Sequence, residues 1–199
     1  MRTKALFALL VSGFLAFSGF ISAAEDQPQT QAQSPEFSYK FRRGGSFSLE
    51  PALLIPSAPL DRALNNTLGY NVNFDIGVSP DISVVFGAGY YNQKGKSNPD
   101  FYLALCPTWF GIKSKNQFLP TAEVYWEADA ALYYEKSYLI QSSSGATENL
   151  DGGAILGAGF DIWWTRWLLT GFDMRQHLII EDNQVFPMMQ IGFRVGIRG

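Results

Sequence analysis

Charged and apolar side chains alternate along segment 121–135 with a period of two residues. All four carboxylates of this segment share one parity, at Glu123, Glu127, Asp129 and Glu135. The opposite parity carries apolar residues, among them Trp126 and Leu132. Because a helix would scatter these positions around its circumference, the pattern predicts a β-strand with one charged face and one apolar face.

The same period predicts seven further strands, at 45–56, 68–79, 82–92, 100–113, 153–164, 167–178 and 187–198. The cores of 82–92 and 100–113 hold no charge, so the facing of these two segments is not fixed. No run after the N-terminal segment reaches the ~20 apolar residues of a spanning helix, whereas strands of ~9–11 residues are long enough to cross a membrane. Lipid cannot satisfy an open sheet edge. The predicted fold is therefore all-β: an antiparallel up-and-down transmembrane β-barrel of about eight strands.

The connections between the strands alternate in length. Short turns are predicted at Ser79-Pro80-Asp81 and Thr165-Arg166, and a link of intermediate length at 114–120. Longer links are predicted at 57–67, 93–99, 136–151 and 179–186. Outer-membrane barrels combine short periplasmic turns with long external loops, so the alternation favours a barrel with both chain ends in the periplasm.

The N-terminal segment resembles an export signal. Arg2 and Lys4 precede an apolar run that ends at Ser22-Ala23-Ala24, a small-residue cleavage site. We expect a cleaved signal peptide over 1–24, with an uncleaved anchor helix as the alternative. A Gln-, Ser- and Pro-rich flexible periplasmic leader follows over 25–44, and the barrel occupies 45–199. The expected location is the bacterial outer membrane.

Glycine and aromatic residues favour a membrane barrel over a soluble β-sandwich or a lipocalin-like carrier. Glycines interleave with charges on the polar face, as the narrow interior of an eight-stranded barrel requires. Aromatic residues on the apolar face are expected near the two membrane interfaces. Those expected toward the longer loops are Tyr70, Tyr90 and Tyr134, and those toward the short turns are Trp109 and Trp164.

A family resemblance rests on segment 157–169, Gly157-Ala158-Gly159-Phe160-Asp161-Ile162-Trp163-Trp164-Thr165-Arg166-Trp167-Leu168-Leu169. This glycine–aromatic hairpin resembles those of the OmpA/OmpX-like outer-membrane barrel superfamily, often labelled the porin family. The resemblance covers about 45–199 and implies outer-membrane lipid and the barrel-assembly machinery as partners. Such barrels usually finish on an aromatic residue, whereas here the last aromatic is Phe193.

The charged parity of the strands predicts a network of side chains in the lumen. Its expected members are Glu50, Asp75, Glu123, Glu127, Asp129, Glu135, Asp161, Asp173, Arg175, His177, Arg194 and Arg198. Carboxylates and guanidinium groups that pair across the lumen would fill it, because buried charges need partners. The alternative is a small cation-selective pore or transporter lined by the surplus acids.

An enzymatic role is less favoured by the sequence. His177 suggests a lipid-modifying enzyme, but Asp173 on the same face would have its Cα ~13 Å away. A carboxylate partner is the expected role of His177. No metal or phosphate-binding motif occurs and no cofactor is expected, and Cys106 is expected to be an apolar filler.

The chain offers no basic stripe for nucleic acid. Its net charge is −3, and loss of Arg2 and Lys4 with the signal peptide makes it more negative. Loop 136–151 is a candidate contact for an extracellular partner, although a plain solvated loop is favoured. The first expectation for function is thus a structural or surface-interaction barrel with a largely filled polar lumen.

Overall fold

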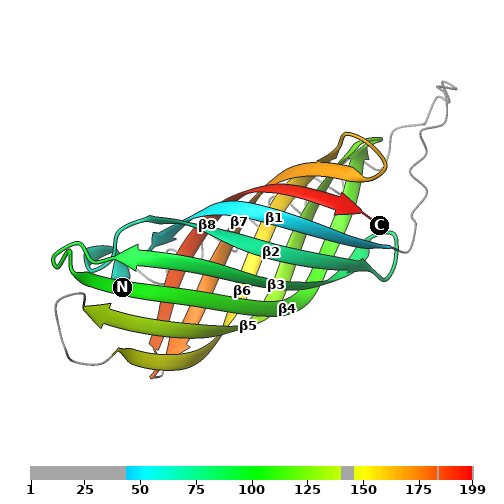
Figure 1. Cartoon of the computed structure of the whole chain (residues 1–199). Coiled ribbons are helices and arrows are strands. Elements are labelled where there is room, and N and C mark those ends of the chain that lie inside the picture. Colours follow the sequence, from blue (N-terminus) through cyan, green and yellow to red (C-terminus); the bar gives the residue numbers. More distant parts are fainter. Residues whose placement is uncertain (1–43, 140–145, 183, 199) are drawn as a thin grey trace, which may run out of the picture. The chain divides into compact units, whose positions relative to one another are not determined.

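Eight strands form one closed antiparallel barrel in the computed structural model, which describes residues 44–139, 146–182 and 184–198 (Figure 1). Each strand pairs with the next one in sequence, and β1 pairs with β8 to close the sheet. The strands are β1 (Gly45–Pro56), β2 (Thr67–Gly77), β3 (Ile82–Lys94), β4 (Phe101–Leu119), β5 (Ala122–Leu139), β6 (Thr147–Trp163), β7 (Leu168–Glu181) and β8 (Gln184–Arg198). The predicted fold class is confirmed.

A single 3-10 turn, Leu60–Arg62, is the one helical element of the described residues. None of the helical structure in those same ranges is long and apolar enough to span a membrane. The predicted signal peptide (1–24) and all of the predicted leader except Gly44 lie outside the described residues and stay predictions.

Successive connections alternate between the two ends of the barrel, and the longer ones lie at one end together with one two-residue connection (Figure 1). Residues 78–81, 120–121 and 164–167 connect strands at one end, which we call the short-turn end. Residues 57–66, 95–100, 140–146 and 182–183 connect strands at the other, which we call the loop end. β1 begins and β8 finishes at the short-turn end, because Gly45 pairs with Ile76 and Ser46 pairs with Arg198.

Two predicted links are wrong because the strands continue through them. Segment 114–120 is mostly strand, since β4 runs to Leu119 and pairs with β5 up to the turn at 120–121, with an irregularity between Gln117 and Leu119. Segment 179–186 is a tight hairpin, in which Ile180 pairs with Val185 and Glu181 with Gln184. Asp182 there has φ 47°, the left-handed conformation that two-residue hairpin turns require.

Loop 136–151 is also shorter than predicted. β5 extends to Leu139 and β6 begins at Thr147, and Lys136 pairs with Glu148 across the two strands. Residues 140–145 lie outside the described part of the chain. The sequence underestimated β4, β5 and β6 because polar residues at one end of each strand interrupt the apolar alternation.

The interior of the barrel is mainly apolar toward the loop end, with Gln93 as a buried polar exception, and mainly polar in its middle. A buried apolar cluster occupies the half next to the loop end and includes Leu54, Leu105, Ile179 and Met188. Leu64, from the connection after β1, packs onto this cluster and is held by an isolated bridge to Gly95. Buried polar and charged side chains fill the region between this apolar plug and the short-turn end.

Candidate functional site: the buried network of the lumen

Most of the predicted lumen residues are buried inside the barrel. Nine of the twelve are at most 7% exposed: Glu50, Asp75, Glu127, Asp129, Asp161, Asp173, Arg175, His177 and Arg194. The other three are half-buried, with Glu135 toward the loop end and Glu123 and Arg198 toward the short-turn end. The alternation of the strands brings these groups together from β1, β2, β5, β6, β7 and β8.

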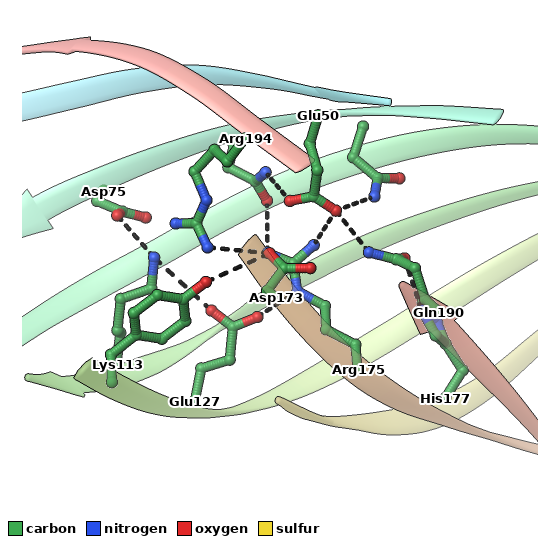
Figure 2. Close-up of polar contacts among 12 residues, drawn as sticks. Glu50, Asp75, Lys113, Glu127, Asp173, Arg175, His177, Gln190 and Arg194 are labelled. Carbon is green, nitrogen blue, oxygen red and sulfur yellow. Dashed lines mark hydrogen bonds and ion pairs between the residues drawn. The ribbon is translucent and has the colours of Figure 1, made fainter. Parts of the chain in front are cut away.

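Arg175 on β7 is the centre of the network (Figure 2). Its Nε donates a short hydrogen bond to Glu127 on β5. One terminal nitrogen donates to Glu50 Oε1 at 3.2 Å, and the other lies 3.2 Å from Asp173 Oδ2 and donates to Asn73 at 3.3 Å. One guanidinium group therefore joins strands β1, β2, β5 and β7 across the lumen.

Asp173 accepts contacts from a second arginine. Arg194 on β8 donates to Asp173 Oδ2 at 2.9 Å (Figure 2). Its other terminal nitrogen lies 3.7 Å from Asp161 Oδ2. Tyr125 Oη donates to the same Asp173 oxygen at 3.3 Å. Three donors thus converge on one buried carboxylate oxygen.

Lys113 on β4 extends the network toward the short-turn end. Its Nζ donates to Asp75 Oδ2 at 2.8 Å and lies 3.7 Å from Glu127 Oε2. Two cations lie close to the Tyr125 ring, with Lys113 Nζ 4.5 Å and Arg194 Cζ 4.7 Å from its centroid. These cation–π contacts add attraction for charges that have left water.

The sequence missed Lys113 because the fourth strand was predicted to finish at this residue. The strand in fact continues for six residues, which puts Lys113 and Lys115 on the inward parity. The signal that could have found them is the spacing of the two lysines, two residues apart on a single parity.

A neutral chain of hydrogen bonds links the charges to the apolar plug. Gln190 donates through Nε2 to Glu50 at 2.5 Å, and its Oε1 accepts from His177 Nε2 at 2.9 Å. His177 Nδ1 then accepts from the Tyr133 hydroxyl at 3.1 Å. The expected carboxylate partner of His177 is therefore replaced by an amide and a phenol, which occupy both ring nitrogens.

The position of Trp109 shows that the predicted facing of β4 is wrong. It was expected at the lipid interface, but it is 4% exposed and lies in the lumen, where Arg175 Cζ is 5.3 Å from its ring centroid. The other four predicted interface aromatics are exposed on the outside, at Tyr70, Tyr90, Tyr134 and Trp164. Trp109 was misplaced because no charge within the predicted strand core marked which parity faces inward.

Acids outnumber bases among the buried groups of the described residues, with six carboxylates against Lys113, Arg175 and Arg194. Several carboxylate oxygens, including both of Asp129, have no hydrogen-bond partner among those residues. A cavity of about 170 Å³ opens at the short-turn end, where Asp75, Lys115 and Arg198 help to line it. Across the described ranges, no three His, Cys, Asp or Glu residues are grouped so as to hold a metal ion.

Solved structures with this fold come from several bacteria. Neisserial surface protein A superposes with a TM-score of 0.62 at 14% identity, covering 77% of this chain and 95% of that one. The attachment invasion locus protein Ail of Yersinia pestis, in complex with the heparin analogue sucrose octasulfate, gives 0.57 at 12% identity, covering 79% and 100%.

The N-terminal β-barrel domain of Pseudomonas aeruginosa OprF gives a TM-score of 0.54 at 14% identity and covers 77% and 97% of the two chains. No family model matches the sequence, and no curated protein matches it. The structural similarities confirm the predicted fold: this chain forms a closed eight-stranded antiparallel barrel like those of these outer-membrane proteins.

Proposed function

We propose that this chain is an integral protein of the bacterial outer membrane, exported by its signal peptide, whose closed barrel has a structural or surface-interaction role rather than a transport role. The single observation that carries this proposal is the lumen, which is crossed by the Arg175 network and holds a buried apolar cluster on the loop-end side of it. The outer surface of the barrel supports membrane insertion, and the interior supports a closed lumen.

The outer surface supports insertion in lipid. The outward parity exposes large apolar side chains on all eight strands, such as Leu49 at 53% and Leu156 at 53%. Charged residues of the described strands occupy this parity only at Lys94, Lys136 and Glu148, all near the loop end. A lipocalin-like carrier has the opposite arrangement, because its outside is solvated and its interior holds an apolar ligand.

The interior supports a closed lumen. Arg175 reaches acids on three strands, and a buried apolar cluster that includes Leu54, Leu105, Ile179 and Met188 lies on the loop-end side of this network. The surplus of buried acids supports the second candidate, a cation-selective pore, but a continuous path would have to pass both the Arg175 network and this apolar cluster. We therefore favour the closed barrel.

The test combines folding and conductance. Protein folded in detergent is expected to shift its gel mobility on heating, as folded outer-membrane barrels do, and then to give no steady current in a planar bilayer. A protein that stays soluble and monodisperse without detergent refutes the membrane proposal. Stable cation-selective steps refute the closed lumen and leave the membrane assignment intact.

We also propose that the barrel is not an enzyme. Both ring nitrogens of His177 are used by Tyr133 and Gln190, which leaves no free base for a nucleophile. Substitution His177→Gln is expected to leave the lipid A profile of the producing cells unchanged. Loss of a lipid A species on this substitution would instead indicate the lipid-modifying role.

We also propose two protein partners. The barrel-assembly machinery would insert the chain, and the loop end would meet any extracellular partner. Between β5 and β6, the described part of this end is strand, with Lys136 hydrogen-bonded to Glu148 at 2.7 Å. A partner that uses segment 136–151 would therefore meet the paired ends of β5 and β6 within that segment.

A further inference from the structure

A small charged patch interrupts the apolar outer surface of the barrel. We call it the outer lysine patch and define it as Lys94, Tyr102, Lys136, Tyr138 and Glu148. It comes from four neighbouring strands, β3 to β6, at the loop end. Its three charged residues are the only charged residues on the outward parity of the described strands.

The strand register brings the two lysines close together. Lys94 pairs with Tyr102, and Tyr102 pairs with Tyr138, so these three residues form one row. Lys136 lies in the next row, two residues from Tyr138 on the same face of β5. With strands ~4.8 Å apart and two residues spanning ~7 Å, the Cα atoms of the two lysines are about 12 Å apart.

Aromatic contacts order the patch. The Tyr102 and Tyr138 rings stack with centroids 5.5 Å apart, and Lys94 Nζ lies 5.8 Å from the Tyr102 centroid. Lys136 Nζ donates to Glu148 Oε1 at 2.7 Å and keeps further N–H donors. The Lys94 ammonium group is therefore ordered by a tyrosine ring and the Lys136 ammonium group by a carboxylate.

The depth of the patch matches a lipid headgroup. Tyr90 and Tyr134 are outward aromatics of the kind that mark the membrane boundary. Lys136 lies two residues beyond Tyr134, and Lys94 four residues beyond Tyr90, toward the loop end. These steps are ~7 and ~13 Å along tilted strands, which places the ammonium groups in the polar layer just outside the hydrocarbon.

We propose that the outer lysine patch binds the phosphorylated headgroup of a lipid in the surrounding leaflet, with Lys94 and Lys136 on the phosphate oxygens. Phosphate is the headgroup chemistry that two ordered ammonium groups complement. Acyl chains of the same lipid would lie on the apolar band below the tyrosines. This inference rests on the proposed function, since it requires the barrel to be in a membrane.

The experiment is a titration of the folded full chain in detergent with diphosphoryl lipid A, with bound lipid counted by native mass spectrometry. The double variant K94Q/K136Q is expected to raise the apparent Kd roughly 30-fold. K96Q/R166Q, which removes two positive charges outside the patch, is expected to bind as the wild type does. Dephosphorylated lipid A is expected to bind all three proteins equally.

Two further variants keep the result decisive. K94R/K136R retains both charges and is expected to bind as the wild type does, and E148Q removes the competing carboxylate and is expected to bind at least as tightly. Equal binding by K94Q/K136Q and the wild type overturns the inference, as does an equal loss in K96Q/R166Q. A chain that never gives a heat-modifiable folded band overturns the proposed function as well, whereas a folded chain with lysine-independent binding overturns only the patch.

Discussion

Arg175 Cζ lies 5.3 Å from the centroid of the Trp109 ring, and both side chains are buried in the lumen. The contact joins the guanidinium group that organises the charge network to an aromatic residue of the apolar cluster. It thus connects the two halves of the interior, and removal of either residue should disturb both. The charged half depends most on Arg175.

Replacement of Arg175 by Met is expected to lower the free energy of unfolding by about 3–5 kcal/mol, because Glu50, Glu127 and Asp173 lose their shared buried partner. Urea unfolding in lipid vesicles, followed by tryptophan fluorescence, measures this change. The double variant R175M/E127Q should lose less than the two single variants together, since they share one interaction. Additive losses would show that the contact with Glu127 contributes nothing.

Gly87 allows Trp109 to lie flat in the lumen. A Cβ at this position would be 2.1 Å from Trp109 Cε2, so Gly87→Ala should destabilise the barrel by about 1–3 kcal/mol. Gly152→Ala is the matched control, because nothing lies within 4 Å of a Cβ there, and it should change stability by less than about 0.5 kcal/mol. Heat-modifiability after folding at several urea concentrations compares the two, and equal midpoints would contradict the packing.

The facing of Trp109 can be measured with brominated lipid. Bromine on the acyl chains quenches only the tryptophans that contact lipid. Trp126→Phe should therefore remove quenchable emission, because Trp126 is 45% exposed on the outside. Trp109→Phe should remove emission that brominated lipid never quenched. A loss of quenchable emission in the Trp109 variant would restore the lipid-interface assignment.

Arginine on the outer surface should be costly in proportion to its depth. Leu156 is at the middle of the outward apolar run of β6, so Leu156→Arg is expected to cost about 2–4 kcal/mol in lipid. Trp164→Arg adds the same charge at the short-turn end and should cost at most about 1 kcal/mol. Unfolding from vesicles measures both, and a soluble β-domain would tolerate the two substitutions equally.

The sequence could predict most of the fold from one-dimensional periodicity. The carboxylates of 121–135 share a parity whatever the neighbouring strands do, so the inward face of β5 follows from the chain alone. The prediction of which strand face points inward failed only where charges were absent, as at Trp109. The prediction of strand length failed where polar residues continue a strand, as at 114–119 and in the hairpin after Ile180.

The partners within the lumen could not be predicted in the same way. Parity places Glu50 and Arg175 inside, but their 3.2 Å contact joins residues 125 positions apart and depends on the closure of β1 onto β8. The partners of His177 likewise depend on the stagger between β5, β7 and β8, which sets Tyr133 and Gln190 within reach of its ring.

The sequence by itself therefore determined that this chain forms a barrel with an apolar outside and an acidic inside, because successive side chains of a strand point to opposite faces. Only the tertiary structure decided which inward side chains meet across the lumen. Those partners are set by strand stagger and barrel geometry rather than by any one strand.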